Sequence, residues 1–143
     1  IKSTALLANV LAKQLAVDAG AMETILLREG RLMEGSSTTV HVVRAGTICV
    51  PPDSRRILPG TTRGVVLELA ARAGIPERVA EISRDELFSA DEVWLAAATR
   101  EVVAVTRLDH RPVGSGRPGP LWRRLYDLFQ QYKLELEKQP VLP

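Results

Sequence analysis

Apolar residues recur at three- and four-residue spacing through the first twenty positions. Between Ser3 and Ala19 this spacing predicts an amphipathic helix, because side chains three or four positions apart share one face. Ser3 or Thr4 is suited to cap its start, and glycine follows at Gly20. The predicted apolar face consists of Leu6, Leu7, Val10, Leu11 and Leu15, with Lys13 and Gln14 off that face.

Short runs of apolar and β-branched residues follow, and turns separate them. Glu29–Gly30 and Ala45–Gly46 have the composition of tight hairpin turns, so each predicts two antiparallel strands around it. Pro51 and Pro52 end the second ladder, because proline cannot donate to it. The four predicted strands span residues 23–28, 31–34, 38–44 and 47–50.

Helical and strand patterns alternate in the rest of the chain. Ser83 and Glu86 form the sequence pattern of a capping box, which predicts a single helical turn. Helices are predicted over residues 61–73 and 121–137, and strands over 78–82, 92–96 and 102–108. The inner faces of these two helices are predicted to carry Val65, Val66, Leu69 and Ala70, and Leu121, Trp122, Leu125, Leu128, Phe129 and Tyr132.

Several hairpins mixed with three longer helices predict a mixed α/β, α+β-like fold, in which a curved sheet packs against helices. With 143 residues and 45% hydrophobic content, the chain is large enough for one core. We expect one domain over residues 1–137 and a tail over 138–143. Because the chain starts at Ile1 without an initiator methionine, we also expect it to be a downstream piece of something longer.

Charge and composition exclude several classes of function. The 19 basic and 17 acidic residues leave a net charge of +2, too balanced for an electrostatic nucleic-acid or membrane binder. No apolar run reaches the roughly 20 residues that cross a bilayer. A single cysteine, Cys49, fits a reducing compartment, so we expect a cytoplasmic protein. His41 and His110 stand apart from other ligand types, so no metal site is expected.

Three features suggest a site when they are taken together. Lys2 is an amine at the approach to the first helix, and Glu34 lies at a strand end before the tight turn at Gly35. The run from Leu58 to Arg63 leads through glycine and two threonines into a helix start, which favours an anion. Taken singly, each has an ordinary interpretation as a surface lysine, a solvent-facing turn glutamate or a helix cap.

Pyridoxal phosphate requires this combination of groups. An amine forms a Schiff base with the aldehyde of the cofactor, a carboxylate keeps the pyridine nitrogen protonated, and a helix start binds the phosphate. A lysine must be neutral to attack, so its reference pKa of about 10.4 has to be lowered by burial or a nearby cation.

Six ordered blocks of the sequence resemble the C-terminal domain of the fold-type IV (class IV) pyridoxal-phosphate aminotransferases, most closely the D-amino-acid type. The resemblance extends from Ile1 to Lys133 and implies the curved sheet, or pseudo-barrel, with packed helices of that domain. The blocks are Ile1–Ser3, Met33–Thr38, Ile57–Arg63, Ala90–Leu95, Val105–Asp109, and Pro112–Gly114 with Gly116–Pro120.

The resemblance assigns roles to individual residues. It implies that Lys2 forms the Schiff base and transfers the substrate proton, and that Glu34 pairs with the pyridinium nitrogen. It implies that Thr61 and Thr62 bind the phosphate.

A second phosphate segment, at Ala98 and Thr99, usually carries more hydroxyls than it does here. At Ala97 and Ala98 only backbone N–H groups are therefore expected to donate. Ser37 resembles a position beside the cofactor.

The family also has an N-terminal domain, absent from these residues, and the resemblance implies a homodimer. The implied reaction moves an amino group between a D-amino acid, of the D-alanine type, and a 2-oxo acid. Rivals within the fold are branched-chain L-amino-acid aminotransferase and 4-amino-4-deoxychorismate lyase. A rival of another class is a non-catalytic domain used for ligand binding or assembly. We expect the chain alone to bind cofactor weakly and to be inactive.

Overall fold

The computed structural model describes residues 6–138, which form four helices and nine strands. The helices are α1 (Leu7–Asp18), α2 (Thr61–Arg72), α3 (Arg84–Phe88) and α4 (Pro120–Glu137). The strands are β1 (Ile25–Arg28), β2 (Arg31–Gly35), β3 (Thr39–Arg44), β4 (Thr47–Val50), β5 (Glu77–Val79), β6 (Glu92–Ala97), β7 (Glu101–Val105), β8 (Arg107–Leu108) and β9 (Arg111–Pro112). Within residues 6–138, no helix combines the length and apolar composition needed to span a membrane.

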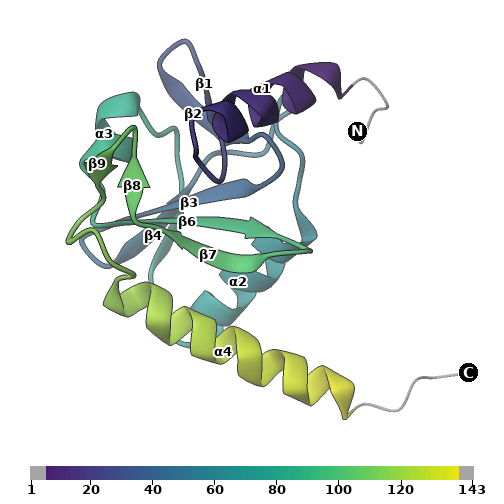
Figure 1. Cartoon of the computed structure of the whole chain (residues 1–143). Helices are drawn as coiled ribbons and strands as arrows, with labels where there is room; N and C mark the ends of the chain where they lie inside the picture. Colours follow the sequence, from purple (N-terminus) through teal and green to yellow (C-terminus); the bar gives the residue numbers. More distant parts are fainter. Residues whose placement is uncertain (1–5, 139–143) are drawn as a thin grey trace, which may run out of the picture.

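A five-stranded mixed sheet in the order β5-β4-β3-β6-β7 organises the molecule. Its neighbours are antiparallel except β4 and β5, which run parallel because α2 carries the chain back between them. Two small antiparallel ladders, β1-β2 and β8-β9, stand beside this sheet (Figure 1). The mixed α/β fold expected from the sequence is therefore confirmed.

The two tight hairpins form where the sequence predicts them. Glu29 and Gly30 have φ of 52° and 73°, and Ala45 and Gly46 have φ of 47° and 74°. Two successive residues with positive φ match the twist of antiparallel strands, which explains the glycine at each second position.

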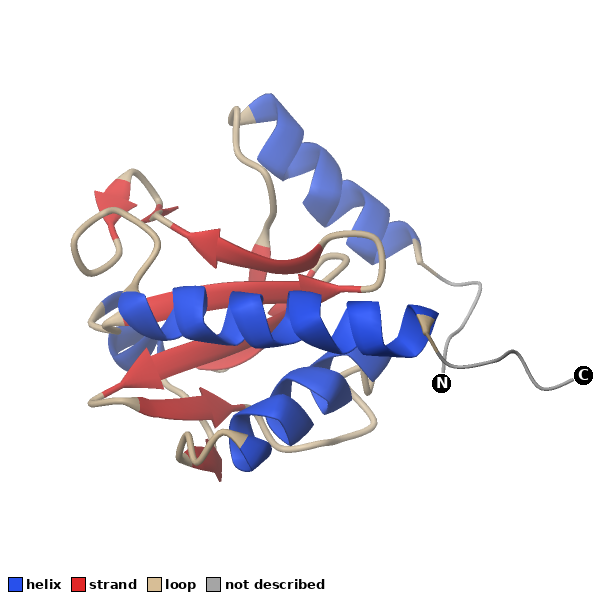
Figure 2. Ribbon diagram, turned by 90° about the horizontal axis from the view of Figure 1, so that it is seen from below, coloured by secondary structure: helices blue, strands red, loops and turns tan. Residues whose placement is uncertain are grey.

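The helices α2 and α4 cover one face of the sheet (Figures 1 and 2). Val66 and Leu125 project from them onto Trp94 of β6, and all three side chains are essentially inaccessible to solvent. Burial of each such side chain contributes about 1.5–3 kcal/mol, so this layer is the main core. The faces predicted for both helices are confirmed by the burial of Val66, Leu69, Ala70, Leu125 and Phe129.

A second apolar layer lies on the opposite face of the sheet. Val40, Val93 and Leu95 point into it from the sheet, and Leu32 of β2 and Leu87 of α3 pack against them. The capping box that holds α3 is present, since the Ser83 hydroxyl accepts from the Glu86 amide and the Glu86 carboxylate accepts from the Ser83 amide. Both faces of the sheet are therefore covered.

Glu92, predicted as the first residue of a buried strand, caps a helix far along the chain. Its carboxylate accepts hydrogen bonds from the backbone amides of Leu121 (2.9 Å) and Trp122 (2.8 Å), in the first turn of α4. The indole of Trp94 donates to it as well, at 2.9 Å. Three donors satisfy this buried acid, which ties α4 to β6.

Two predicted strands differ from the structure in more than their first or last residues. The run 102–108, predicted as one strand, is divided at Thr106 into β7 of the main sheet and β8 of a small ladder. The predicted strand over 78–82 is only Glu77–Val79, and Ile82 instead enters the second core layer. In both segments the neighbouring structure changes along the length of the segment. The pattern of apolar residues within a segment does not reveal such a change.

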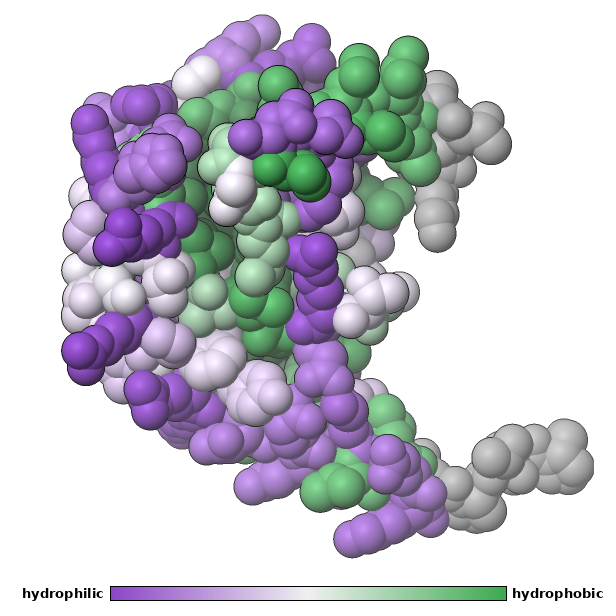
Figure 3. All heavy atoms as spheres, viewed as in Figure 1, coloured by the Kyte–Doolittle hydropathy of each residue, from purple (hydrophilic) through white to green (hydrophobic). Residues whose placement is uncertain are grey.

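The amphipathic helix α1 is present, but its apolar face points away from the rest of the described chain. Leu7, Val10, Leu11 and Leu15 are 57–70% exposed, and Ala16 is the buried residue of the helix. Figure 3 shows this apolar surface at the upper right. The side that meets the protein carries small and polar residues instead, namely Asn9, Ala12, Lys13 and Ala16.

Candidate active site

Glu34, at the end of β2, is bonded to the loop that leads into α2. Its carboxylate accepts a hydrogen bond of 3.0 Å from the backbone amide of Leu58, three residues before Thr61. The acid is partly exposed, so its remaining lone pairs are open to another group. The predicted carboxylate and the predicted phosphate-binding helix are thereby brought to one place.

Gly35 makes the turn after Glu34 possible through lack of a side chain. A Cβ at Gly35 would lie 2.0 Å from the Thr38 hydroxyl, and the Gly35 amide donates to the Thr38 carbonyl at 2.7 Å. Gly35 is not among the residues with positive φ. Close approach of the chain to itself, rather than backbone freedom, fixes the direction of Glu34.

The first turn of α2 fits a phosphate. Gly60 precedes the helix in an extended conformation, no side chain caps it, and no acid lies in its first turn. The amides of this turn have no partner inside the helix and carry the positive end of its dipole. Thr62 is 9% exposed and Thr61 is exposed, so a bound anion would meet backbone donors and a threonine hydroxyl.

Arg63 does not face this anion position. Its guanidinium donates to Asp53 at 2.6 Å and to the Pro51 carbonyl at 2.9 Å, and it is 7% exposed. Arg63 thus pairs with an acidic residue of the preceding loop, Asp53. The salt bridge ties the first turn of α2 to the loop after β4.

Ala98 and Thr99 lie at the same end of the sheet as the start of α2. A Cβ at Gly60 would be 3.0 Å from the Thr39 side chain, and the Thr39 hydroxyl donates to the Ala96 carbonyl at 3.2 Å. Thr39 also pairs with Ala96 in the β3–β6 ladder. The turn after β6 therefore follows closely after Ala96, whose partner Thr39 lies beside the α2 approach at Gly60.

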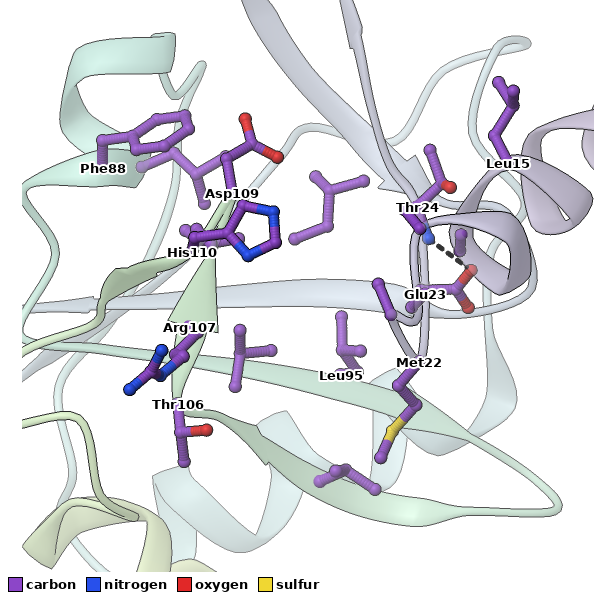
Figure 4. A pocket seen from close by; sticks show the side chains of 18 of the residues that line it. Leu15, Met22, Glu23, Thr24, Phe88, Leu95, Thr106, Arg107, Asp109 and His110 are labelled. Carbon is purple, nitrogen blue, oxygen red and sulfur yellow. Dashed lines mark hydrogen bonds between the residues drawn. The ribbon is translucent and has the colours of Figure 1, made fainter.

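Glu23 is a buried acid in this region that the sequence reasoning did not identify. Its carboxylate accepts hydrogen bonds from the hydroxyls of Ser36 and Ser37, the latter at 2.8 Å. It also accepts one from the Thr24 amide at 2.9 Å, which Figure 4 shows. Burial raises the pKa of Glu23, but these hydrogen bonds and the charge of Lys13 outweigh it and leave the pKa below its ordinary value. Glu23 thus holds the turn that follows Glu34.

Ser37, predicted beside the cofactor, has its hydroxyl committed to Glu23. The same turn is also held from α1, because the Asn9 amide donates to the Ser36 carbonyl at 3.0 Å. Lys13 points inward as well, donating to the Met22 carbonyl and lying 3.7 Å from Glu23. Lys2 lies outside the described residues.

His41 is buried under the start of α2 without a polar partner. It has no exposed surface, stacks on Trp94 with centroids 6.3 Å apart, and neither ring nitrogen has a partner among residues 6–138. Burial and the nearby charge of Arg63 lower its pKa to about 3. It is therefore neutral at physiological pH, and we assign it to the core rather than to the site.

Known proteins resemble this chain in sequence. The family model described as amino-transferase class IV matches residues 1–108. D-alanine aminotransferase of Bacillus licheniformis is 42% identical over 130 residues, which are 91% of this chain and 46% of that protein. The enzyme of the same name from Listeria innocua is 35% identical, over 90% of this chain and 45% of that protein.

Solved structures are similar as well. The T.th. branched-chain amino acid aminotransferase with pyridoxamine 5'-phosphate superimposes with a TM-score of 0.84 and 38% identity, over 88% of this chain and 42% of that one. The branched-chain aminotransferase of Thermoproteus uzoniensis gives a TM-score of 0.86 and 30% identity, over 93% of this chain and 44% of that one. This chain therefore spans about half the length of these relatives.

The resemblance seen in the sequence blocks is thus confirmed by the family model, by sequence relatives and by structure. The region around Glu34 and the start of α2 lies within the residues that the family model matches. The chain belongs to the class IV aminotransferases.

Proposed function

We propose that this chain is the cofactor-binding half of a pyridoxal-phosphate-dependent aminotransferase that acts on D-amino acids and 2-oxo acids. The hydrogen bond between Glu34 and the Leu58 amide carries the proposal, because it joins a partly exposed acid to a helix start without a cap. D-alanine aminotransferases at 35–42% identity support the substrate class.

Each residue has a chemical task in this proposal. Bound pyridoxal phosphate supplies an aldehyde for the amino group and a ring that accepts electrons. Glu34 would pair with the protonated ring nitrogen, and its bond to the Leu58 amide orients the carboxylate. The first turn of α2, with Thr61 and Thr62, binds the phosphate.

We further propose that the amides of Ala98 and Thr99 add donors to the phosphate from the turn after β6. Lys2 would supply the amine that holds the cofactor aldehyde as a Schiff base, and it would move the substrate proton. Ser37 supports the site through Glu23 rather than by direct contact, since its hydroxyl already donates to that acid. In the whole protein, an N-terminal domain and a second subunit complete the substrate pocket.

Branched-chain L-amino-acid transamination is the second candidate. The structures of branched-chain aminotransferases at 30–38% identity favour it. The two candidates differ in how the substrate is oriented over the ring, and the residues that do this belong largely to the proposed N-terminal domain. The present chain supports the shared chemistry in both.

Borohydride reduction in the presence of pyridoxal phosphate tests the assignment of the amine. We expect the label on the peptide that contains Lys2, and Lys2→Arg should abolish it. Lys13 and Lys133 are matched controls, because both amines are engaged by acids, Glu23 and Glu101. Label on either control lysine, with Lys2 unmodified, would reject the assignment, and no label at all would favour a non-catalytic domain.

An assay with the N-terminal half supplied then tests the substrate. D-alanine with 2-oxoglutarate should give pyruvate, and the isolated chain should give none. Turnover of L-leucine without turnover of D-alanine would replace the leading candidate with the branched-chain one.

A further inference from the structure

The side of α1 that meets the protein is built from small and polar residues. Asn9, Ala12, Lys13 and Ala16 share this side at helical spacing, and Ala16 is the one buried residue of the helix. Because the helix buries so little apolar area, packing alone holds it weakly. Its position against the described chain therefore depends on the hydrogen bonds that this side makes.

Three side-chain hydrogen bonds attach α1 to the described chain that follows it. The Asn9 amide donates to the Ser36 carbonyl at 3.0 Å, and the Thr24 hydroxyl donates to the Ala12 carbonyl at 2.6 Å. The Lys13 amine makes the third bond, to the segment just before Thr24. Of the three, the Asn9 bond lies nearest the start of the helix.

The acceptor of this bond, Ser36, is fixed at every polar group. Its amide donates to the Thr24 carbonyl at 2.9 Å, its hydroxyl donates to Glu23, and its carbonyl accepts from Asn9. It is 7% exposed and comes two residues after Glu34. Asn9 therefore joins the helix to a well-held turn beside the acid of the candidate site.

We propose that Asn9 is a positioning residue that fixes the Schiff-base lysine relative to the acid that pairs with the ring nitrogen. The inference rests on the proposed function, in which Lys2 and Glu34 bind one ring. Lys2 precedes Leu6 by four residues, which span at most about 14 Å, so the start of α1 limits where the amine can reach. The aldehyde and the nitrogen lie on opposite sides of the pyridine ring, so the amine and the acid must keep a constant separation.

Glu34 is held in place without Asn9. Its carboxylate accepts from the Leu58 amide at 3.0 Å, and the next residue, Gly35, donates to the Thr38 carbonyl at 2.7 Å. Loss of the Asn9 bond should therefore displace the helix and its lysine while the acid keeps its position. Ligands that need one or both of these groups can distinguish the two effects.

Asn9→Asp tests the proposal, because it keeps the shape of the side chain but replaces the donor with a carboxylate that the Ser36 carbonyl repels. In the 143-residue chain, borohydride-fixed label on Lys2 should need about 10-fold more pyridoxal phosphate for half-maximal yield than in wild type. Gln14→Glu is the matched control, an amide-to-acid change on α1 at a side chain that donates to Asp18 of the same helix. It should change the required concentration by less than about 2-fold.

Pyridoxamine 5'-phosphate separates positioning from folding. It carries the ring nitrogen and the phosphate but an amine in place of the aldehyde, so it cannot condense with Lys2. Its dissociation constant, measured by calorimetry, should differ by less than about 2-fold between wild type and Asn9→Asp, because Glu34 and the start of α2 keep their positions. Equal weakening of this binding and of the labelling would contradict the proposal, since the turn itself would then have collapsed.

Asn9→Ala is a second variant that introduces no repelling charge, and it should show the same difference between the two ligands at about 5-fold. Deuterium exchange of residues 7–18 should be faster in both Asn9 variants, while exchange of residues 61–72 stays unchanged. Equal labelling of wild type and both variants would overturn this inference alone. Absence of label on Lys2 in wild type would reject the proposed function and this inference with it.

Discussion

At the scale of single residues, His41 is a buried base that lowers stability in acid. The unfolded chain binds a proton to this imidazole below pH 6.5, whereas the folded protein, with a pKa of about 3, does not. The stability that depends on neutral His41 is therefore complete above pH 6.5 and is lost as the pH falls toward 3. The loss is about 1.4 kcal/mol per pH unit in that window.

His41→Phe should remove this acid sensitivity. On going from pH 7.5 to pH 5, wild type should lose about 2 kcal/mol more of its free energy of unfolding than the variant does, as measured by urea unfolding. His110→Phe is the control, because His110 is exposed in a turn and should change the pH dependence little. Parallel pH profiles of wild type and His41→Phe would contradict this account.

Glu23 is the residue whose loss should loosen the turn after Glu34. Hydrogen bonds and the charge of Lys13 keep the pKa of Glu23 in the folded protein below its value in the unfolded chain, although burial acts in the opposite direction. The stability that ionised Glu23 provides is therefore complete above the unfolded-state pKa and is lost as the pH falls below that value. Glu23→Gln should cost about 1–3 kcal/mol at pH 7 in urea unfolding, and the difference should shrink in acid.

Glu29→Gln is the matched control for Glu23→Gln, because Glu29 is exposed at the tip of the adjoining hairpin. It should change the free energy of unfolding by no more than about 0.5 kcal/mol. Equal effects at the two positions would show that Glu23 has no special role.

At the scale of elements, the attachment of α4 depends on Glu92. Glu92→Ala leaves one buried and two partly buried donors without their acceptor, so we expect a loss of about 3 kcal/mol in denaturant unfolding. Gly119→Ala should be comparably harmful, since its Cβ would lie 2.1 Å from the Glu92 carboxyl carbon. Glu81→Ala, which removes only an exposed ion pair with Arg31, should cost little. If it cost as much, the cap would not explain the result.

Elements that depend on residues close together in the sequence are predicted well. The hairpin turns at Gly30 and Gly46 and the capping box at Ser83 all depend on residues a few positions apart, and all are present. The division of 102–108 between two ladders depends on strands elsewhere in the chain. The sequence of α1 likewise predicts an apolar face but not its direction. The same periodicity would be seen whether that face pointed into the domain or away from it.

The candidate site could be predicted only in part for the same reason. Glu34, Thr61 and Thr62 belong to motifs that resemble those of a known family. Glu23 acts on hydroxyls 13 and 14 residues away and belongs to no such motif, so its role became visible only in the folded chain. The hydrogen bond from the Ser37 hydroxyl to Glu23 has the same origin.

At the scale of the whole molecule, the layers differ in how firmly they are held. Between α2 and α4 lies the main core, whereas α1 buries only Ala16 and is held by side-chain hydrogen bonds. In dilute solution the amides of residues 7–18 should exchange with deuterium well before those of residues 61–72, because local opening of α1 uncovers little apolar area. Mass spectrometry of the two peptides measures this, and equal protection would contradict it.

The bond between Glu34 and Leu58 has a consequence for how such enzymes diversify. The donor is a backbone amide, so every residue type at position 58 except proline preserves it, while the Leu58 side chain itself is 43% exposed. Variation can therefore change the exposed surface at this position without disturbing the hydrogen bond that orients the acid. The main chain at position 58 holds the acid, and the side chain there is free to vary.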